Sequence, residues 1–75
     1  MTPTAIRNNI RRLRFDANEM TQAELAEKIG VTRQTLLAIE AAKYSPTLEL
    51  AFKIAKVFGV PLENVFQYGD EVIAG

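Results

Sequence analysis

The sequence contains no cysteine and no histidine. The absence of cysteine excludes a disulfide bridge, a thiolate zinc site and a thiol redox sensor. The absence of histidine removes the usual nitrogen ligand for metals and the usual proton shuttle near neutral pH. No apolar stretch is long enough to span a bilayer, and the N-terminus lacks the basic flank and apolar run of a signal peptide. We therefore expect a cytoplasmic protein with no cofactor, no membrane partner and no small-molecule ligand.

The sequence also lacks an excess of charge of either sign, because nine Lys and Arg residues balance nine Asp and Glu residues. A protein that binds nucleic acid without selectivity is basic overall, so the net charge of zero gives no support to such binding. The positions of the charges are more informative, since Arg33 and Lys43 bracket one predicted helix. The length of 75 residues and the apolar fraction of 48% predict a single compact domain over residues 1–75.

Capping residues divide the chain into five predicted helices. Asn8 or Asn9 is expected to cap the first helix, and Thr21 and Glu24 form a capping box at the start of the second. Thr32 and Thr47 stand in the N-cap position of the third and fourth helices. The predicted spans run from about Asn9 to Ala17, from Thr21 to Gly30, from Arg33 to Ala41, from Leu48 to Phe58, and from Pro61 to about Val65 or Phe66.

Apolar residues recur within these spans at the spacing of one helix face, which predicts an all-α fold. After the fifth helix, Phe66-Gln67-Tyr68 alternates apolar and polar residues, as in a short strand, and we expect the segment near Ala5 and Ile6 to pair with it. The apolar positions expected to face inward are Ile10, Leu13, Leu25, Ala26, Ile29, Leu36, Ile39, Leu50, Ala51, Ile54, Ala55 and Phe58.

The second and third predicted helices, joined by a tight turn at Gly30, form a helix-turn-helix from Thr21 to Ala41. In such a unit the first helix crosses the phosphate backbone of DNA, and the second places its N-terminal residues in the major groove. Arg33 can present a bidentate fork to guanine, and Gln34 can pair with adenine. Gln22 opens the first helix of the pair, where a side-chain amide and free backbone N–H groups can hold a phosphate oxygen.

The run TQAELAEKIGVTRQTLLAIE, followed by AAKYSPTLELAFKIAKVFGV and PLENVF, resembles the Cro/repressor-type (XRE-family) helix-turn-helix regulators. The extended N-terminus and the Phe-Gln-Tyr end are similar to small dimeric bacterial repressors of the cytolysin-operon type. The resemblance covers about residues 9–66. It implies a lambda-repressor-like bundle of five helices with short terminal β-strands, which binds double-stranded operator DNA as a homodimer and is not an enzyme.

The resemblance also implies roles for individual residues. It places Arg14 and Glu40 in a structural ion pair between helices. The family usually has a glycine where this chain has Ala42, so we expect either a positive φ that costs about 1 kcal/mol or a shifted turn. The implied DNA contacts are Gln22 on phosphate, Arg33, Gln34 and Leu37 toward bases, and Thr32, Thr35, Lys43 and Tyr44 near the backbone.

For the dimer, we expect an interface outside the helix-turn-helix. Residues 66–75 are its predicted strand and tail, and Val72 and Ile73 extend the apolar stripe. Leaving such a stripe in water is unfavourable, which favours a subunit contact. The predicted dimer residues are Leu62, Val65, Phe66 and Tyr68.

The sequence therefore predicts a transcriptional repressor that reads an inverted-repeat operator through the helix starting at Arg33. An alternative from another class is an antitoxin-like or adaptor protein whose main role is to bind another protein. An enzyme is not favoured, because the carboxylates are scattered over helix surfaces and no phosphate-cradling glycine loop is present. Arg11 and Arg12 are expected to form a solvated face, and the alternative is that one of them reaches DNA.

Overall fold

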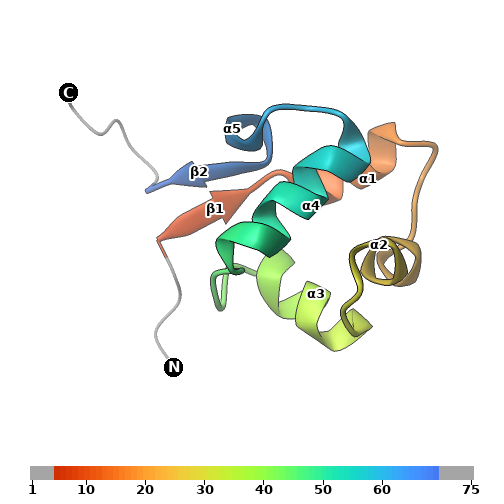
Figure 1. Ribbon diagram of the computed structural model, residues 1–75, viewed down its shortest axis with the longest axis horizontal. Helices are drawn as coiled ribbons and strands as arrows, with labels where there is room; N and C mark the ends of the chain where they lie inside the picture. The colour runs from red at the N-terminus through yellow and green to blue at the C-terminus, as the bar shows by residue number, and fades with distance from the viewer. Residues whose placement is uncertain (1–4, 70–75) are drawn as a thin grey trace.

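The computed structural model describes residues 5–69 as five helices and two short strands (Figure 1). This confirms the predicted bundle with short strands at its two ends, and the helix boundaries agree with the predicted ones to within a residue. The elements are β1 (Ile6–Asn8), α1 (Ile10–Asp16), α2 (Gln22–Ile29), α3 (Arg33–Glu40), α4 (Leu48–Phe58), α5 (Leu62–Val65) and β2 (Phe66–Tyr68).

The two strands pair in antiparallel fashion within one molecule. Ile6 lies opposite Tyr68, and Asn8 lies opposite Phe66. The Gly69 N–H extends the ladder by donating to the Ala5 carbonyl at 2.7 Å. The pair lies at the end of the molecule away from α2 (Figure 1), so the first and last described elements are joined directly.

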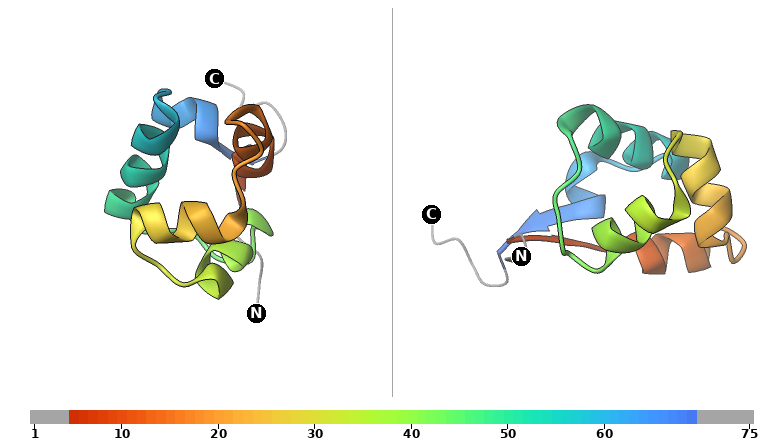
Figure 2. Two further views of the ribbon diagram at one scale, coloured as in Figure 1. Left: turned by 90° about the vertical axis from the view of Figure 1, so that its right-hand side faces the viewer. Right: turned by 90° about the horizontal axis from the view of Figure 1, so that it is seen from below.

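The helices surround a core to which each of them contributes. Viewed end-on, α1 and α4 lie on opposite sides of the molecule, with α5 at one edge and α2 at the other (Figure 2). The inward positions predicted for α2 and α3 are all buried, whereas Leu50 and Phe58 of α4 are half-buried at the core margin. The buried cluster consists of Ile10, Leu25, Ala26, Ile29, Leu36, Ile39, Ile54, Ala55 and Val65.

The predicted caps form at three of the helix starts. The Thr21 hydroxyl accepts from the Glu24 N–H at 3.0 Å, and the Glu24 carboxylate accepts from the Thr21 N–H at 2.8 Å. Thr32 and Thr47 each accept from the backbone N–H three residues later. These bonds satisfy N–H groups that have no partner inside the helix.

The start of α1 is built differently, because β1 runs almost directly into it. Asn9 occupies the N-cap position but makes no capping bond with its side chain. The Asn8 Oδ1 atom instead accepts from the Ile10 N–H at 3.1 Å. The Asn9 side-chain amide donates to the Asn64 carbonyl at 3.1 Å, and its backbone N–H donates to the Val65 carbonyl at 2.9 Å. Both asparagines therefore anchor α1, and Asn9 ties it to α5.

Three helices end in the same hydrogen-bond pattern, a Schellman motif, but with different residues at the left-handed position. Gly30 after α2 and Gly59 after α4 have φ values of 80° and 67°. After α3 the position is taken by Ala42, whose φ is 59°. The Lys43 N–H donates to the Ala38 carbonyl and the Ala42 N–H to the Ile39 carbonyl, both at 3.0 Å. Of the two expected outcomes, the chain keeps the turn and accepts a positive φ at an alanine.

The Arg14 and Glu40 side chains join α1 to the end of α3. Arg14 Nε lies 2.7 Å from Glu40 Oε2, and Arg14 Nη2 lies 3.1 Å from Glu40 Oε1. The exposed fractions of the two side chains are 14% and 10%, so solvent screens this pair weakly. Arg14 Nη1 also donates to the Met20 carbonyl at 2.9 Å, which fixes the connection between α1 and α2.

The strain at Ala42 predicts that Ala42→Gly stabilises the protein. A left-handed alanine is disfavoured by about 1–2 kcal/mol, and the added freedom of glycine in the unfolded chain offsets part of that gain. We expect the free energy of unfolding to rise by about 0.5–1 kcal/mol in chemical denaturation. Ala41→Gly is the control, because Ala41 has a φ of −82° and a glycine there relieves nothing. If Ala42→Gly and Ala41→Gly lowered the stability equally, Ala42 would not be strained.

The partly buried pair predicts coupling between Arg14 and Glu40. Removing one partner of a fully buried pair typically costs about 3–5 kcal/mol and an exposed pair contributes under about 1 kcal/mol, so we expect a loss between these limits. We expect Arg14→Ala and Glu40→Ala each to lower the melting temperature clearly. The double variant should lose much less than the sum of the two. Additive, near-zero losses in a double-mutant cycle would show that the pair contributes little.

Candidate nucleic-acid interface

The site is built on α2, the turn after it, and α3. Gly30 ends α2 in the left-handed conformation, and the Val31 N–H donates back to the Ala26 carbonyl at 3.0 Å. Thr32 then starts α3. Leu25, Ile29, Leu36 and Ile39 are buried between the two helices and the rest of the core, so the polar side of α3 is turned outward. The geometry is that of a helix-turn-helix.

The outward side of α3 carries the residues predicted to read bases. Arg33 and Gln34 are exposed in the first turn, and Leu37 is exposed one turn later. The Thr32 hydroxyl accepts from the Thr35 N–H at 3.1 Å and donates to the Thr35 hydroxyl at 3.0 Å. This cap holds the first turn of α3, so Arg33 and Gln34 project from a fixed backbone.

A shallow groove runs between α1, the start of α2 and α3. Among the predicted DNA-contacting residues, it brings together Gln22, Arg33 and Leu37. The Gln22 Nε2 atom donates to Glu40 Oε1 at 3.3 Å, so the ion pair that joins α1 to α3 also orients this amide. One Nε2 hydrogen of Gln22 remains available for a phosphate oxygen.

The remaining predicted contacts lie at the other end of α3. Lys43 and Tyr44 are both exposed in the loop that follows the strained Ala42. They are separated from Arg33 by the length of α3, about 12 Å at 1.5 Å per residue. The groove reaches Glu40 and Ala41 at this end of α3 but does not include Lys43 and Tyr44, so these two residues extend the candidate interface beyond it.

The structure corrects one of the predicted dimer residues. Val65 is fully buried in the core of the molecule, so its side chain is not accessible to a second subunit. Leu62 and Phe66 are half-buried because they pack against the same core, and of the four only Tyr68 is largely exposed, at 64%. Residues 70–75, with Val72 and Ile73, lie outside the described part of the chain.

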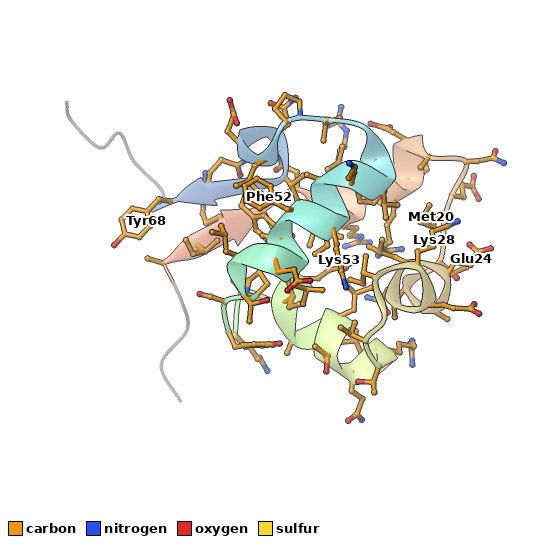
Figure 3. The ribbon with its side chains drawn as sticks, in the orientation of Figure 1. Met20, Glu24, Lys28, Phe52, Lys53 and Tyr68 are labelled. Atoms are coloured by element: carbon orange, nitrogen blue, oxygen red, sulfur yellow. The ribbon has the colours of Figure 1, made fainter. Side chains whose placement is uncertain are left out.

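Two exposed apolar residues of α4 were not predicted to take part in any contact. Leu48 is 68% exposed and Phe52 is 52% exposed. Figure 3 shows Phe52 on the side of α4 nearer the strands, and Tyr68 projecting beyond β2. The sequence could have indicated this exposed pair. Leu48 and Phe52 are four residues apart, so they share one face of the helix, and neither belongs to the residues predicted to face inward.

A further contact that the sequence did not reveal holds the C-terminal end of α3. The Asn8 Nδ2 atom donates to the carbonyls of Ile39 and Glu40, at 2.9 and 3.3 Å. Since more than 30 positions separate Asn8 from these residues, no local spacing indicates the contact. Asn8 thereby links β1, the start of α1 and the end of α3.

Residues 5–69 contain neither a membrane-spanning helix nor an acidic metal site. No helix there has the length and apolar character needed to cross a membrane. Within the same range, the acidic side chains form no group of three or more that is suited to holding a metal ion.

Comparison with known proteins places this geometry in a family. A family model described as helix-turn-helix matches residues 10–65. A helix-turn-helix-type transcriptional regulator of Methanocaldococcus jannaschii is 57% identical over 54 residues, which is 72% of this chain and 82% of that protein. The cryptic phage CTXphi transcriptional repressor RstR of Vibrio cholerae is 44% identical over 58 residues, which is 77% of this chain and 51% of RstR.

The fold has a counterpart among solved structures as well. A crystal structure of a protein from Bacteroides fragilis superimposes with a TM-score of 0.73 over 83% of this chain and 98% of that one, at 22% sequence identity. At this identity the likeness concerns the fold alone. The matched family, together with the α2–turn–α3 geometry, shows that the chain belongs to the helix-turn-helix family and is a transcriptional regulator with a helix-turn-helix DNA-binding domain.

Proposed function

We propose that this chain is a cytoplasmic, sequence-specific repressor that binds an inverted-repeat operator as a homodimer and reads it through α3. The observation that carries the proposal is the exposure of Arg33 and Gln34 in the first turn of a helix whose two ends are fixed, beside Gln22. The first turn of a recognition helix is the part that enters the major groove. In this proposal residues 1–75 form a single helix-turn-helix domain.

Each exposed residue of the interface has a defined role in this proposal. Arg33 donates a bidentate pair of hydrogen bonds to guanine, and Gln34 pairs with adenine. Leu37 contacts a thymine methyl group. Gln22 donates its remaining amide hydrogen to a phosphate. The residues that position the protein on the DNA backbone are Thr32, Thr35, Lys43 and Tyr44.

Repression follows from occupancy of the DNA. A protein of this kind that covers a promoter-proximal operator excludes RNA polymerase without any further activity. The similarity to the phage repressor RstR supports this direction of regulation. The groove beside α3 is shallow and open, and Gln22, Arg33 and Leu37 of the proposed DNA contacts line it, which suits DNA better than a small effector.

The dimer uses exposed apolar residues at the end of the molecule that carries the strands. The start of α4 and β2 lie at this end in two views (Figures 1 and 2), and they expose Leu48, Phe52 and Tyr68. The exposed charges of α4 have both signs, with Glu49 near its start, Lys53 in its middle and Lys56 near its end. A two-fold axis that pairs two copies of α4 in opposite directions brings unlike charges together.

A dimer also satisfies the geometry of the duplex. One recognition helix touches too few base pairs for operator-grade affinity, and two symmetric copies reach successive major grooves when their recognition helices lie about 34–36 Å apart. Viewed from below, α3 lies between α1 and α4 (Figure 2), so a contact through α4 leaves the α1 side of α3 open.

The proposed roles predict different consequences for Arg33 and Lys43. Arg33→Ala should weaken binding to the preferred duplex by about 1–3 kcal/mol and relax the preference at one base pair in each half-site. Lys43→Ala should weaken binding to all sequences similarly and flatten the dependence on salt, since it removes a phosphate contact. Selection of bound duplexes from a random pool, followed by titration, measures both effects. Equal losses on selected and random DNA would contradict the division into reading and positioning residues.

The proposed dimer predicts that the intact chain sediments as a dimer at micromolar concentration without DNA. Phe52→Ser should shift it toward the monomer, because an exposed apolar side chain of the interface is lost. Phe15→Ser is the matched control, since Phe15 is also exposed, at 66% against 52% for Phe52, but lies on α1, which is on the opposite side of the molecule from α4. A monomeric intact chain would rule out the dimer and favour the alternative in which this surface binds another protein, as in an antitoxin or adaptor.

A further inference from the structure

The groove beside α3 has a second wall that does not belong to the helix-turn-helix. That wall is α1, which contributes Arg11 and Phe15 to the same hollow that Gln22 and Arg33 line. Arg11 and Phe15 are four residues apart on α1, so they lie on one face of the helix. This face therefore adjoins the surface that contacts DNA.

Arg11 differs from its neighbour Arg12 in its surroundings. Arg12 Nε lies 3.7 Å from Asp16 Oδ2 in an exposed pair. Both arginines line a second, smaller hollow with Phe15, but only Arg11 also lines the groove beside α3. Of the two arginines, the fold therefore places Arg11 nearer the candidate interface.

Phe15 is exposed on the side of α1 that lines the groove. Its exposed fraction is 66%, while the core of the molecule takes Ile10 and Leu13 from the same helix. An exposed aromatic ring at this place offers a large apolar contact area to a partner that enters the groove. The ring stands next to Arg11, so a partner that covers Phe15 also meets a guanidinium group.

The groove carries net positive charge, which suits a polyanion, although the net charge of the whole chain is zero. Three arginines line the groove, Arg11, Arg14 and Arg33, together with two acidic residues, Glu19 and Glu40. Arg14 and Glu40 neutralise each other through their bidentate pair. Arg11 and Arg33 then face one remaining carboxylate, so the groove carries net positive charge.

From this placement we propose that α1 forms a second contact with the same DNA duplex. The Arg11 guanidinium binds a backbone phosphate next to the major groove that α3 enters, and the Phe15 ring packs against the adjacent deoxyribose. Most contacts of DNA-binding proteins go to phosphate and sugar, and such contacts set the register of the protein on the duplex. The inference rests on the proposed function, since it extends the interface formed by Gln22 and Arg33.

The test is a titration of the duplex selected by the intact chain, at several salt concentrations, with single variants. Arg11→Ala should bind several-fold more weakly and lower the slope of log affinity against log salt by about 0.9 per subunit, the value for one phosphate contact. Phe15→Ala should bind more weakly with the slope unchanged, because no counterion is released. Arg12→Ala, the matched control, should retain both affinity and slope. All three side chains are exposed, so equal melting temperatures should show that the variants fold.

The outcomes separate this inference from the proposed function. If Arg33→Ala and Gln22→Ala weaken binding while Arg11→Ala behaves like Arg12→Ala, the second contact is wrong and the proposed function stands. If Arg11→Ala and Arg12→Ala lower the slope equally, Arg11 acts only as general positive charge, and the specific contact is overturned. If the intact chain selects no duplex, the proposed function itself fails.

Discussion

The bidentate contact between Arg14 and Glu40 determines where α3 lies relative to α1. The same Arg14 donates to the Met20 carbonyl, and the same Glu40 accepts from Gln22, so four segments of the chain meet at this point. In a core built mainly from leucine, isoleucine and alanine, a directional contact specifies one arrangement that apolar packing alone leaves less well defined. The residue expected to hold phosphate and the helix expected to read bases are therefore parts of one rigid unit.

The two ends of α3 are held by different contacts, and only those at its C-terminal end involve backbone strain. At its start Thr32 forms an unstrained cap with Thr35. At its end, Asn8 binds the last carbonyls and Ala42 adopts a conformation that glycine adopts more readily at the ends of α2 and α4. Backbone strain of this kind persists where the surrounding structure imposes it, and it is often found at functional segments. Here the strained turn leads directly into Lys43 and Tyr44.

The helices were predictable because their signals are local. Thr21, Thr32 and Thr47 lie within three residues of the N–H groups that they cap, and the apolar spacing reports each inward face. The buried state of Val65 and the different surroundings of Arg11 and Arg12 depend on how the helices pack, which no local pattern encodes. The roles of Arg14 and Glu40 came from resemblance to a family, since their spacing along the chain indicates no contact.

The pairing of β1 with β2 has a consequence for the order in which the molecule assembles. Ile6 and Tyr68 are opposite one another although nearly the whole described chain separates them, so their ladder closes a very long loop. Contacts between consecutive helices, such as α2 with α3, can form earlier, whereas the strands must wait until the helices bring the ends together. We therefore expect a nascent chain to complete its recognition helix before it positions Tyr68, so that the full surface formed by Leu48, Phe52 and Tyr68 exists only in finished molecules.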